Sequence, residues 1–319
     1  AAQNHHIFKE LQYLSNIDYK PIRYISFAHD EETYKALEAS KAWSKAEMIA
    51  PKQFREEISP YFNANPKKYI SALVSEDCWQ ATPGKVVDLV RNLGIAAGGT
   101  VMEDCRVLEA CREGKYTSVL VQTHDKKYVE YRTEHFVNAL GSGAGKLCDS
   151  MGIDAGLYPV RHQAFITRRL PMLGKHGTNL DMLIDRQDYK GFSAVYGQQI
   201  AYTGQIIGCA SPKLDAMRID KNLKVNTKAF LEIVSEMFSE WIPDLAGVGI
   251  QAVWAGYYTE PRYIVDPELG LFVGMRGHGF MLSQYIARMY VDKLLGRPVP
   301  EYFEKLKLNG PGLSEKAFK

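Results

Sequence analysis

The sequence predicts a mixed α/β fold made of two interleaved domains, and three observations predict it. From residue 78 onward, apolar residues at helical spacing alternate with short β-rich segments. Residues 160–210 instead alternate apolar and polar side chains between turn signals, which is typical of an antiparallel sheet. The chain has 319 residues, of which 46% are apolar and 24% charged, so it can bury a large core without disulfides.

The first third begins with a helix that carries Ile7, Leu11 and Leu14 on one face. A strand is expected over residues 22–27, followed by helices over residues 31–45 and 51–58. Pro51 suits the first turn of the last of these, because the N–H that proline lacks has no intrahelical partner there.

The next segment contains a helix followed by a series of strands. Thr82 is expected to cap this helix and Gly94 to end it. Strands are expected over residues 100–102, 106–110, 117–122, 128–131 and 135–140. A short helix then runs from Ala144 and ends at Gly152.

The last third shows the strongest helical periodicity. Residues 229–241 form an amphipathic helix, and residues 250–257 return to a strand. A short buried strand over residues 271–274 leads through a glycine-rich turn into the last helix, which ends before Gly296.

Composition excludes several classes of protein. The net charge of +2 gives no support to a nucleic-acid or anionic-membrane partner, and no apolar run reaches the ~18 residues of a spanning helix. The five cysteines are odd in number and include no CxxC pair, so we expect a reducing compartment, the cytoplasm. The histidines offer no metal-ligand spacing. The chain opens at Ala1 without Met, which is expected of a processed or cut end.

Two glycine-rich turns are candidates for ligand binding. The first, at residues 141–146, fails as a phosphate loop because three residues, not four, separate Gly141 from Gly145 and Leu147 follows the lysine. It is either a tight strand-to-helix turn or a place where a ligand approaches the backbone.

The second turn, Gly274-Met-Arg-Gly-His-Gly279, ends a buried strand and opens a helix. Its free N–H groups and the helix dipole suit an anion, and Arg276 adds a cation beside them. A turn that merely lets helix and sheet pack explains the glycines equally well. His278 is isolated in sequence, and such a histidine is usually structural.

At this point several motifs together resemble a known family. Trp254-Ala-Gly-Tyr-Tyr258 and Gly274-Met-Arg-Gly-His-Gly-Phe-Met281 resemble the C-terminal signature of flavin-dependent amine oxidoreductases of the D-amino-acid oxidase superfamily. The closest types are the sarcosine oxidase β subunit, dimethylglycine dehydrogenase and dye-linked L-proline dehydrogenase. Three further stretches agree in order: 78–110, 137–141 and 158–163.

The resemblance implies a glutathione-reductase-like FAD-binding domain interleaved with an antiparallel-sheet substrate domain. The substrate domain would take residues 18–77 and 158–265. The FAD-binding domain would take residues 1–17, 78–157 and 266–297, and residues 298–319 would be a C-terminal tail. The implied reaction transfers a hydride to flavin from the carbon beside nitrogen in a small amino acid or secondary amine such as sarcosine, glycine or proline.

The resemblance also implies roles for individual residues. Tyr258 and His278 would be catalytic, and Tyr258 and Arg161 would bind substrate. The residues expected to bind FAD are Val107, Asn138, Ala139, Gly141, Gly274, Arg276, Gly277, His278, Gly279, Phe280 and Met281. At Gly277 we expect close backbone approach and a positive φ. No metal ligand is implied.

The sequence departs from the family most at its start. The family opens with a βαβ unit bearing G-x-G-x-x-G, which holds the FAD pyrophosphate, and no segment here matches it. Arg276 also stands where the family has serine. The FAD-binding domain is therefore expected to be incomplete. Either the sequence is a fragment whose upstream segment carries the unit, or a partner chain supplies it in a hetero-oligomer, or the protein has lost canonical flavin binding. The alternative function is a non-catalytic or partner-completed subunit of a flavoprotein complex.

Overall fold

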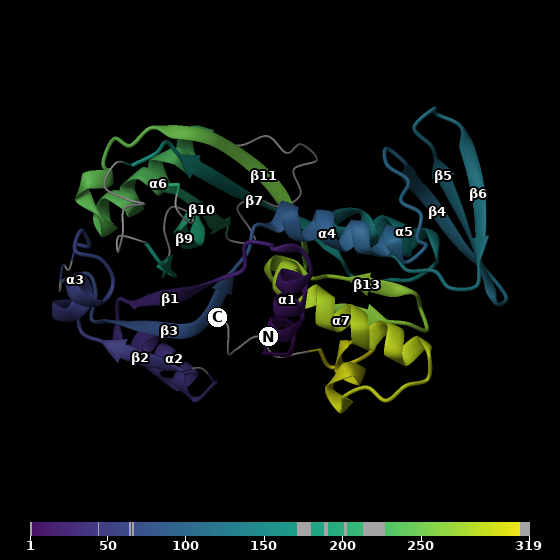
Figure 1. Ribbon diagram of the computed structural model, residues 1–319, viewed down its shortest axis with the longest axis horizontal. Helices are drawn as coiled ribbons and strands as arrows, with labels where there is room; N and C mark the ends of the chain where they lie inside the picture. The colour runs from purple at the N-terminus through teal and green to yellow at the C-terminus, as the bar shows by residue number, and fades with distance from the viewer. Residues whose placement is uncertain are drawn as a thin grey trace. The chain divides into compact units, whose positions relative to one another are not determined.

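The computed structural model describes residues 2–43, 45–63, 65, 67–170, 180–187, 191–200, 203–212 and 227–312. The chain folds into two compact units (Figure 1). Unit 1 comprises Ala1–Tyr19, Ala81–Val160 and Tyr257–Lys319, and unit 2 comprises Lys20–Gln80 and Arg161–Gly256. Each unit therefore collects segments that are distant in the sequence, which agrees with the predicted interleaved fold.

An eight-stranded mixed sheet supplies most of unit 2, in the order β11-β7-β10-β9-β8-β1-β3-β2. Its strands are β1 (Lys20–Ala28), β2 (Ala46–Ile49), β3 (Ser71–Gln80), β7 (Tyr158–Thr167), β8 (Met182–Asp185), β9 (Phe192–Ile200), β10 (Gln205–Pro212) and β11 (Ile250–Glu260). The expected antiparallel pairing joins β7, β10, β9 and β8. By contrast, β1 and β8 pair in parallel, with Tyr24 opposite Met182. Alternating side chains do not encode strand direction, so the sequence pattern could not show this pair.

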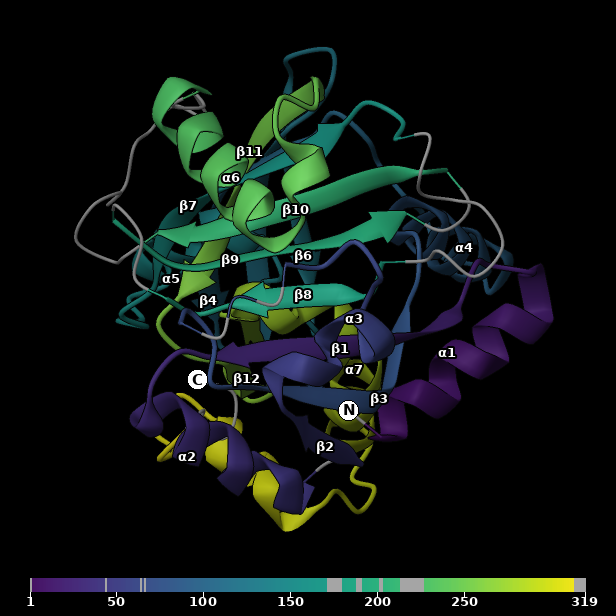
Figure 2. The same ribbon diagram turned by 90° about the vertical axis from the view of Figure 1, so that its left-hand side faces the viewer.

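The helix α6 (Thr227–Trp241) covers one face of this sheet, as Figure 2 shows. Its buried residues Phe230, Ile233, Phe238 and Trp241 lie on the predicted apolar face. The ring of Phe238 meets that of Phe165 on β7 edge to face, with 5.3 Å between centroids. A side chain at Gly197 on β9 would place its Cβ 2.6 Å from the Phe238 ring, so this glycine makes room for the helix.

Short helices connect β1, β2 and β3 at one edge of the sheet: α2 (Glu31–Ser40), η1 (Lys41–Trp43), η2 (Pro51–Gln53) and α3 (Phe54–Glu57). A further 3-10 turn, η4 (Pro243–Leu245), follows α6 and precedes β11. A capping box between Asp30 and Thr33 begins α2. The expected helix over residues 31–45 is present as α2 followed directly by η1, and the chain then enters β2, which pairs with β3 at the sheet edge. The strand β2 is not predicted from the sequence.

Unit 1 contains four α-helices and two small sheets within the described residues. The helices are α1 (Ala2–Ser15), α4 (Pro83–Ala96), α5 (Ala144–Ser150) and α7 (Gly279–Leu294), with 3-10 turns η3 (Gly141–Gly143), η5 (Arg276–His278) and η6 (Glu301–Leu306). One sheet is β4-β5-β6 (Arg106–Glu113, Tyr116–Gln122 and Tyr128–Thr133), and the other pairs β12 (Ile264–Asp266) with β13 (Leu271–Val273). Figure 1 shows α1 beside α7.

Two of the predicted strands in unit 1 are wrong. Residues 100–102 form no regular structure. Residues 135–140 form only one bridge, in which Asn138 pairs in parallel with Leu271. The partner strand β13 has three residues, so it offers too little edge for a longer ladder. Apolar alternation indicates a strand only where a neighbouring strand exists to pair with it.

The helix α4 continues through Gly94 to Ala96, and the Thr82 side chain makes no cap hydrogen bond. Of its residues only Val86 is buried, while Val87, Val90 and Leu93 are exposed. Across the described ranges, no helix is both long enough and apolar enough to span a membrane.

Candidate functional site

The C-terminal end of β11 places Tyr258 and Glu260 on one face of the strand, because residues two apart on a strand point to the same side. Both residues belong to unit 1, together with the turn that follows β13. The carboxylate of Glu260 is mostly buried. Burying a charge is costly unless the charge is paired, so this carboxylate requires a partner.

Arg276 is that partner. Its Nε lies 2.5 Å from Oε2 of Glu260, and the two side chains are 18% and 10% exposed. The backbone of Arg276 has φ of +49°, a left-handed conformation that non-glycine residues rarely adopt. The guanidinium is therefore held by an ion pair on a strained turn rather than extended into solvent.

Gly274 allows the chain to turn after β13. Its φ is +71°, and a Cβ here would lie 1.9 Å from the carbonyl oxygen of Arg262. Backbone atoms cannot give way by that amount, so only glycine fits. The turn is consequently tied to the segment that follows β11.

Gly277 lies against a side chain of the protein itself, and it lacks the expected positive φ. A Cβ at Gly277 would lie 2.8 Å from Cε2 of Tyr258, so the tyrosine ring lies directly against this glycine. The left-handed residue is its neighbour Arg276. The position of the strained residue depends on how η5 continues into α7.

His278 forms a hydrogen bond with Tyr263, with 2.5 Å between Nδ1 and the phenol oxygen. Burial lowers the pKa of His278, and the charge of Arg276 lowers it further. Burial raises the pKa of Tyr263. At neutral pH the pair is therefore an uncharged imidazole against an uncharged phenol, which makes His278 a hydrogen-bonding group and a poor cation.

The helix α7 begins without a side-chain cap at His278, so the N–H groups of its first turn receive no hydrogen bond from the capping residue. Gly279 opens the helix, and a Cβ there would lie 3.0 Å from the Met275 side chain. Phe280 lies edge to face with Phe8 of α1. The carbonyl of Met281 accepts a hydrogen bond from Asn4. This end of the helix presents backbone donors beside Tyr258.

The strand end at residues 138–141 adjoins β13, because Asn138 bridges to Leu271 on that strand. The buried Asn138 donates to the carbonyl of Ala144 and accepts from the N–H of Leu140, so its amide holds the turn into α5. Ala139 and Gly141 are exposed, and Gly141 has φ of +54° with open space at its Cβ position. Val107 lies on β4, where it is half-buried.

Arg161 belongs to unit 2, where it is buried on β7. The structure therefore brings together Tyr258, Arg276, Gly277 and His278 within unit 1. Two further residues of this cluster, Glu260 and Tyr263, are not predicted from the sequence. Glu260 could have been predicted, since strand alternation places it on the same face as Tyr258, two residues earlier. No pattern in the sequence points to Tyr263.

A comparison with known protein families shows which family the chain belongs to. The family model described as "FAD dependent oxidoreductase" (DAO) matches residues 1–293, which is most of the chain. The chain belongs to this family. FAD is accordingly its cofactor and oxidoreduction its class of reaction.

Solved structures of similar fold agree with this family. L-proline dehydrogenase from P. horikoshii has 22% sequence identity and a TM-score of 0.76, covering 96% of this chain and 81% of that chain. Glycine oxidase from Geobacillus kaustophilus has 16% identity and a TM-score of 0.78, covering 97% and 81%. L-amino acid deaminase from Proteus vulgaris has 17% identity and a TM-score of 0.68, covering 96% and 78%. No curated protein matches this chain. The predicted fold class is confirmed.

The residues at the start of α7 fit the cofactor of the family. The uncapped N-terminus of α7 offers backbone N–H donors and positive dipole to an electron-rich ring edge. Gly277 itself adds no side chain to this turn, and the Tyr258 ring lies against it. These features suit a flavin, whose ring accepts hydrogen bonds and becomes anionic on reduction.

Proposed function

We propose that this protein oxidises the carbon–nitrogen bond of a small amino acid or secondary amine, such as sarcosine, glycine or proline. Family membership supports the FAD-dependent oxidoreduction. The substrate class is supported by the names of its structural neighbours, which include a proline dehydrogenase and glycine oxidases. The observation that carries the proposal is the Tyr258 ring lying against Gly277 at the uncapped start of α7.

In this proposal FAD supplies a hydride acceptor. Tyr258 contributes a hydroxyl that hydrogen-bonds the carboxylate or amine of the substrate and so orients its reacting carbon. The N–H groups of residues 279–281 would stabilise negative charge on the ring, and Arg276 would add to that field. Because Glu260 is paired with Arg276, much of the arginine's charge is offset, and its contribution is smaller than that of a lone cation.

His278 takes a hydrogen-bonding role in this reaction. Its lowered pKa leaves the imidazole neutral at neutral pH, and Tyr263 fixes the ring through Nδ1. A neutral, oriented imidazole can accept or donate a proton without adding a permanent charge to the site.

The remaining assignments rest on the family resemblance. Val107 and the strand end formed by Asn138, Ala139 and Gly141 would contact the adenine end of FAD, with Asn138 acting through the backbone that its amide positions. Arg161 would be a substrate or interface cation, and it is buried on β7. Unit 2 would contribute to substrate binding and unit 1 to FAD binding. The five cysteines are free, which supports a cytoplasmic location.

A second candidate is a subunit whose flavin site is completed by another segment or chain. The observation that favours it is the exposed apolar face of α4, where Val87, Val90 and Leu93 lie open, together with the exposed Val137 and Leu140 near the Asn138 bridge. Parallel strands are normally covered on both faces, and this parallel bridge is not extended by other strands in the described residues. A βαβ segment that carries a glycine-rich turn would cover both features.

Anaerobic flavin reduction tests the two candidates. The purified chain is mixed with FAD, freed of unbound FAD, and given sarcosine, glycine or proline in turn. The proposed enzyme retains a visible flavin spectrum, and one of these substrates bleaches it. Retained flavin that none of a panel of amino acids and secondary amines bleaches would refute the substrate class. The second candidate would be established if this protein retained no FAD by itself but retained FAD when mixed with a second chain that bears the glycine motif.

A further inference from the structure

Asn4 on α1 makes an unusual contact with α7. Its side chain is almost fully buried, with 2% of its surface exposed. Nδ2 donates to the carbonyl of Met281 at 2.5 Å and to Oε1 of Gln284 at 3.0 Å. Oδ1 accepts from the N–H of Tyr285 at 2.8 Å. One carboxamide thus uses both donors and its acceptor on a helix about 280 residues away in sequence.

The two backbone groups that Asn4 contacts are partners in an ordinary helix. In an α-helix the N–H of residue i donates to the carbonyl of residue i−4, so Tyr285 would bond Met281. Asn4 bonds both groups at once, which is how a side chain joins the hydrogen-bond ladder of a helix. If the side-chain amide of Asn4 were flipped, its NH2 group would face the N–H of Tyr285, and two donors would meet. The contacts therefore determine which atom of the amide is oxygen and which is nitrogen.

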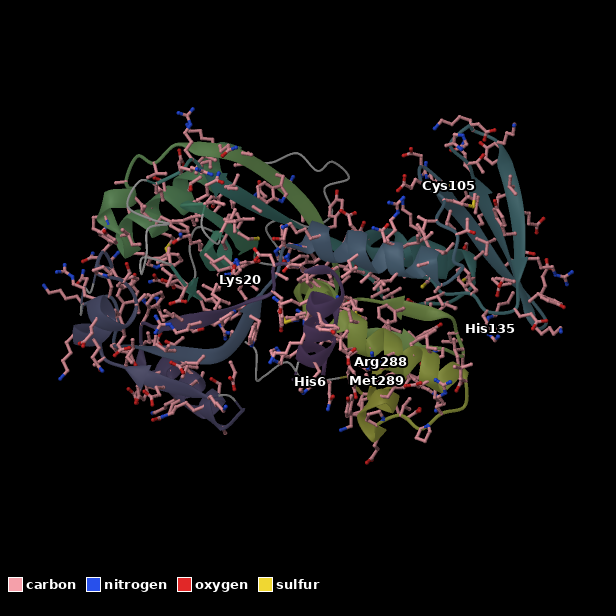
Figure 3. The ribbon with its side chains drawn as sticks, viewed as in Figure 1. His6, Lys20, Cys105, His135, Arg288 and Met289 are labelled. Carbon is pink, nitrogen blue, oxygen red and sulfur yellow. The ribbon has the colours of Figure 1, made fainter. Side chains whose placement is uncertain are left out.

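The neighbouring contacts position α1 along the same part of α7. Phe8 lies edge to face with Phe280, with 5.4 Å between ring centroids, and stacks on Tyr19. Further along, Glu10 lies 3.6 Å from Arg288 in an exposed ion pair. Figure 3 labels His6 on α1 and Arg288 and Met289 on α7. Of these contacts, only that of Asn4 specifies a register through directional bonds to the backbone.

We infer that Asn4 is a positioning residue for the flavin-facing start of α7. By bonding Met281 and Tyr285 it holds the first two turns in one register, and those turns carry the N–H groups of residues 279–281. Its effect on flavin rests on the proposed function, whereas its hold on the helix does not. Leucine has a similar volume but offers none of the three bonds, and aspartate keeps only the acceptor.

Hydrogen exchange of the FAD-free protein tests the hold on the helix. We compare the amides of residues 279–285 in the unsubstituted chain and in Asn4→Leu, Asn4→Asp and Glu10→Gln. Losing these bonds to a buried helix turn is expected to speed exchange by about tenfold in Asn4→Leu. Asn4→Asp should give a smaller increase because it still accepts from Tyr285. Glu10→Gln, on the exposed part of the same contact, should leave exchange unchanged.

FAD affinity and the visible bands of the bound flavin test the link to the site. In Asn4→Leu we expect about tenfold weaker binding of FAD and shifted bands, with neither change in Glu10→Gln. Faster exchange together with unchanged FAD affinity and bands would overturn the positioning role while the proposed function stands. Unchanged exchange in Asn4→Leu would overturn the inference outright. If Asn4→Leu does not fold, Asn4→Asp carries the same comparison. Failure of every chain to bind FAD would count against the proposed function alone, since exchange is measured without FAD.

Discussion

Replacing His29 in unit 2 should remove a pH-dependent contribution to stability. Nδ1 of His29 lies 2.7 Å from the carbonyl oxygen of Lys68, and Nε2 lies 2.7 Å from Oδ1 of Asp185. Both neighbours are acceptors, so both ring nitrogens must carry hydrogen and the imidazole is positively charged. The side chain of Asp185 is fully buried, and among the residues that the structure describes its Oδ2 has no hydrogen-bond partner. The histidine therefore supplies the charge that makes burial of this carboxylate tolerable.

The direction of the pH dependence follows from the pKa of His29. Burial lowers it, but the hydrogen bond and charge of Asp185 and the bond to Lys68 outweigh burial, and the net pKa lies above the ordinary 6.5. The stabilising contribution is thus complete below the unfolded pKa and is lost as pH rises through the folded pKa. Removing one partner of a buried ion pair lowers the free energy of unfolding by about 3–5 kcal/mol. We expect His29→Leu to show this loss at a pH below the unfolded pKa of histidine, where the ion pair is fully formed.

Urea unfolding at about pH 6 and about pH 8 measures the effect. The stability of the unsubstituted chain should exceed that of His29→Leu by a larger margin at the lower pH. His29→Gln, which donates but does not titrate, should flatten the pH dependence. His124→Gln, at an exposed histidine on a turn, should leave it intact. An equal margin for His29→Leu at both pH values would show that the pair is not ionised as argued.

Three substitutions test the site in unit 1. Tyr258→Phe should slow turnover of the best amine substrate by about 1.5–3 kcal/mol in activation free energy while the flavin content, read from the visible spectrum, stays normal; unaltered kinetics would remove Tyr258 from the site. Gly277→Val should abolish flavin retention, because its Cβ would lie 2.8 Å from the Tyr258 ring; wild-type flavin content would show a purely structural turn. Gly274→Ala should lower the thermal stability of unit 1, because its Cβ would lie 1.9 Å from the carbonyl of Arg262; calorimetry showing an unchanged transition would contradict the described turn.

Helices with one apolar face were the most predictable part of this fold. The faces of α6 and α7 can be found from spacing alone, because helical periodicity is a property of neighbouring residues. The motif around Gly274 and Gly277 was also recognisable, since glycine marks positions where a side chain cannot fit. These features depend on local sequence, and the structure reproduces them.

Pairing between distant segments was not predictable. The parallel contact of β1 with β8 joins residues more than 150 positions apart, and neither strand's pattern specifies its partner. The same holds for Asn4, whose polarity in an otherwise apolar helix face gave no hint of the backbone it contacts on α7. A side chain that satisfies a distant backbone has no periodic signature.

The ion pair at the turn shows how such distant contacts determine the site. Arg276 pays about 1–3 kcal/mol for its left-handed backbone, and serine in its place would offer no charge to offset that cost. Glu260 supplies the offset, because a partly buried carboxylate and guanidinium 2.5 Å apart stabilise each other. The same ion pair connects β11 to the turn before α7, so Tyr258 on the strand and Gly277 on the turn keep their contact. The arginine that departs from the family pattern therefore acts as part of a pair, and its partner lies on the strand that also presents Tyr258.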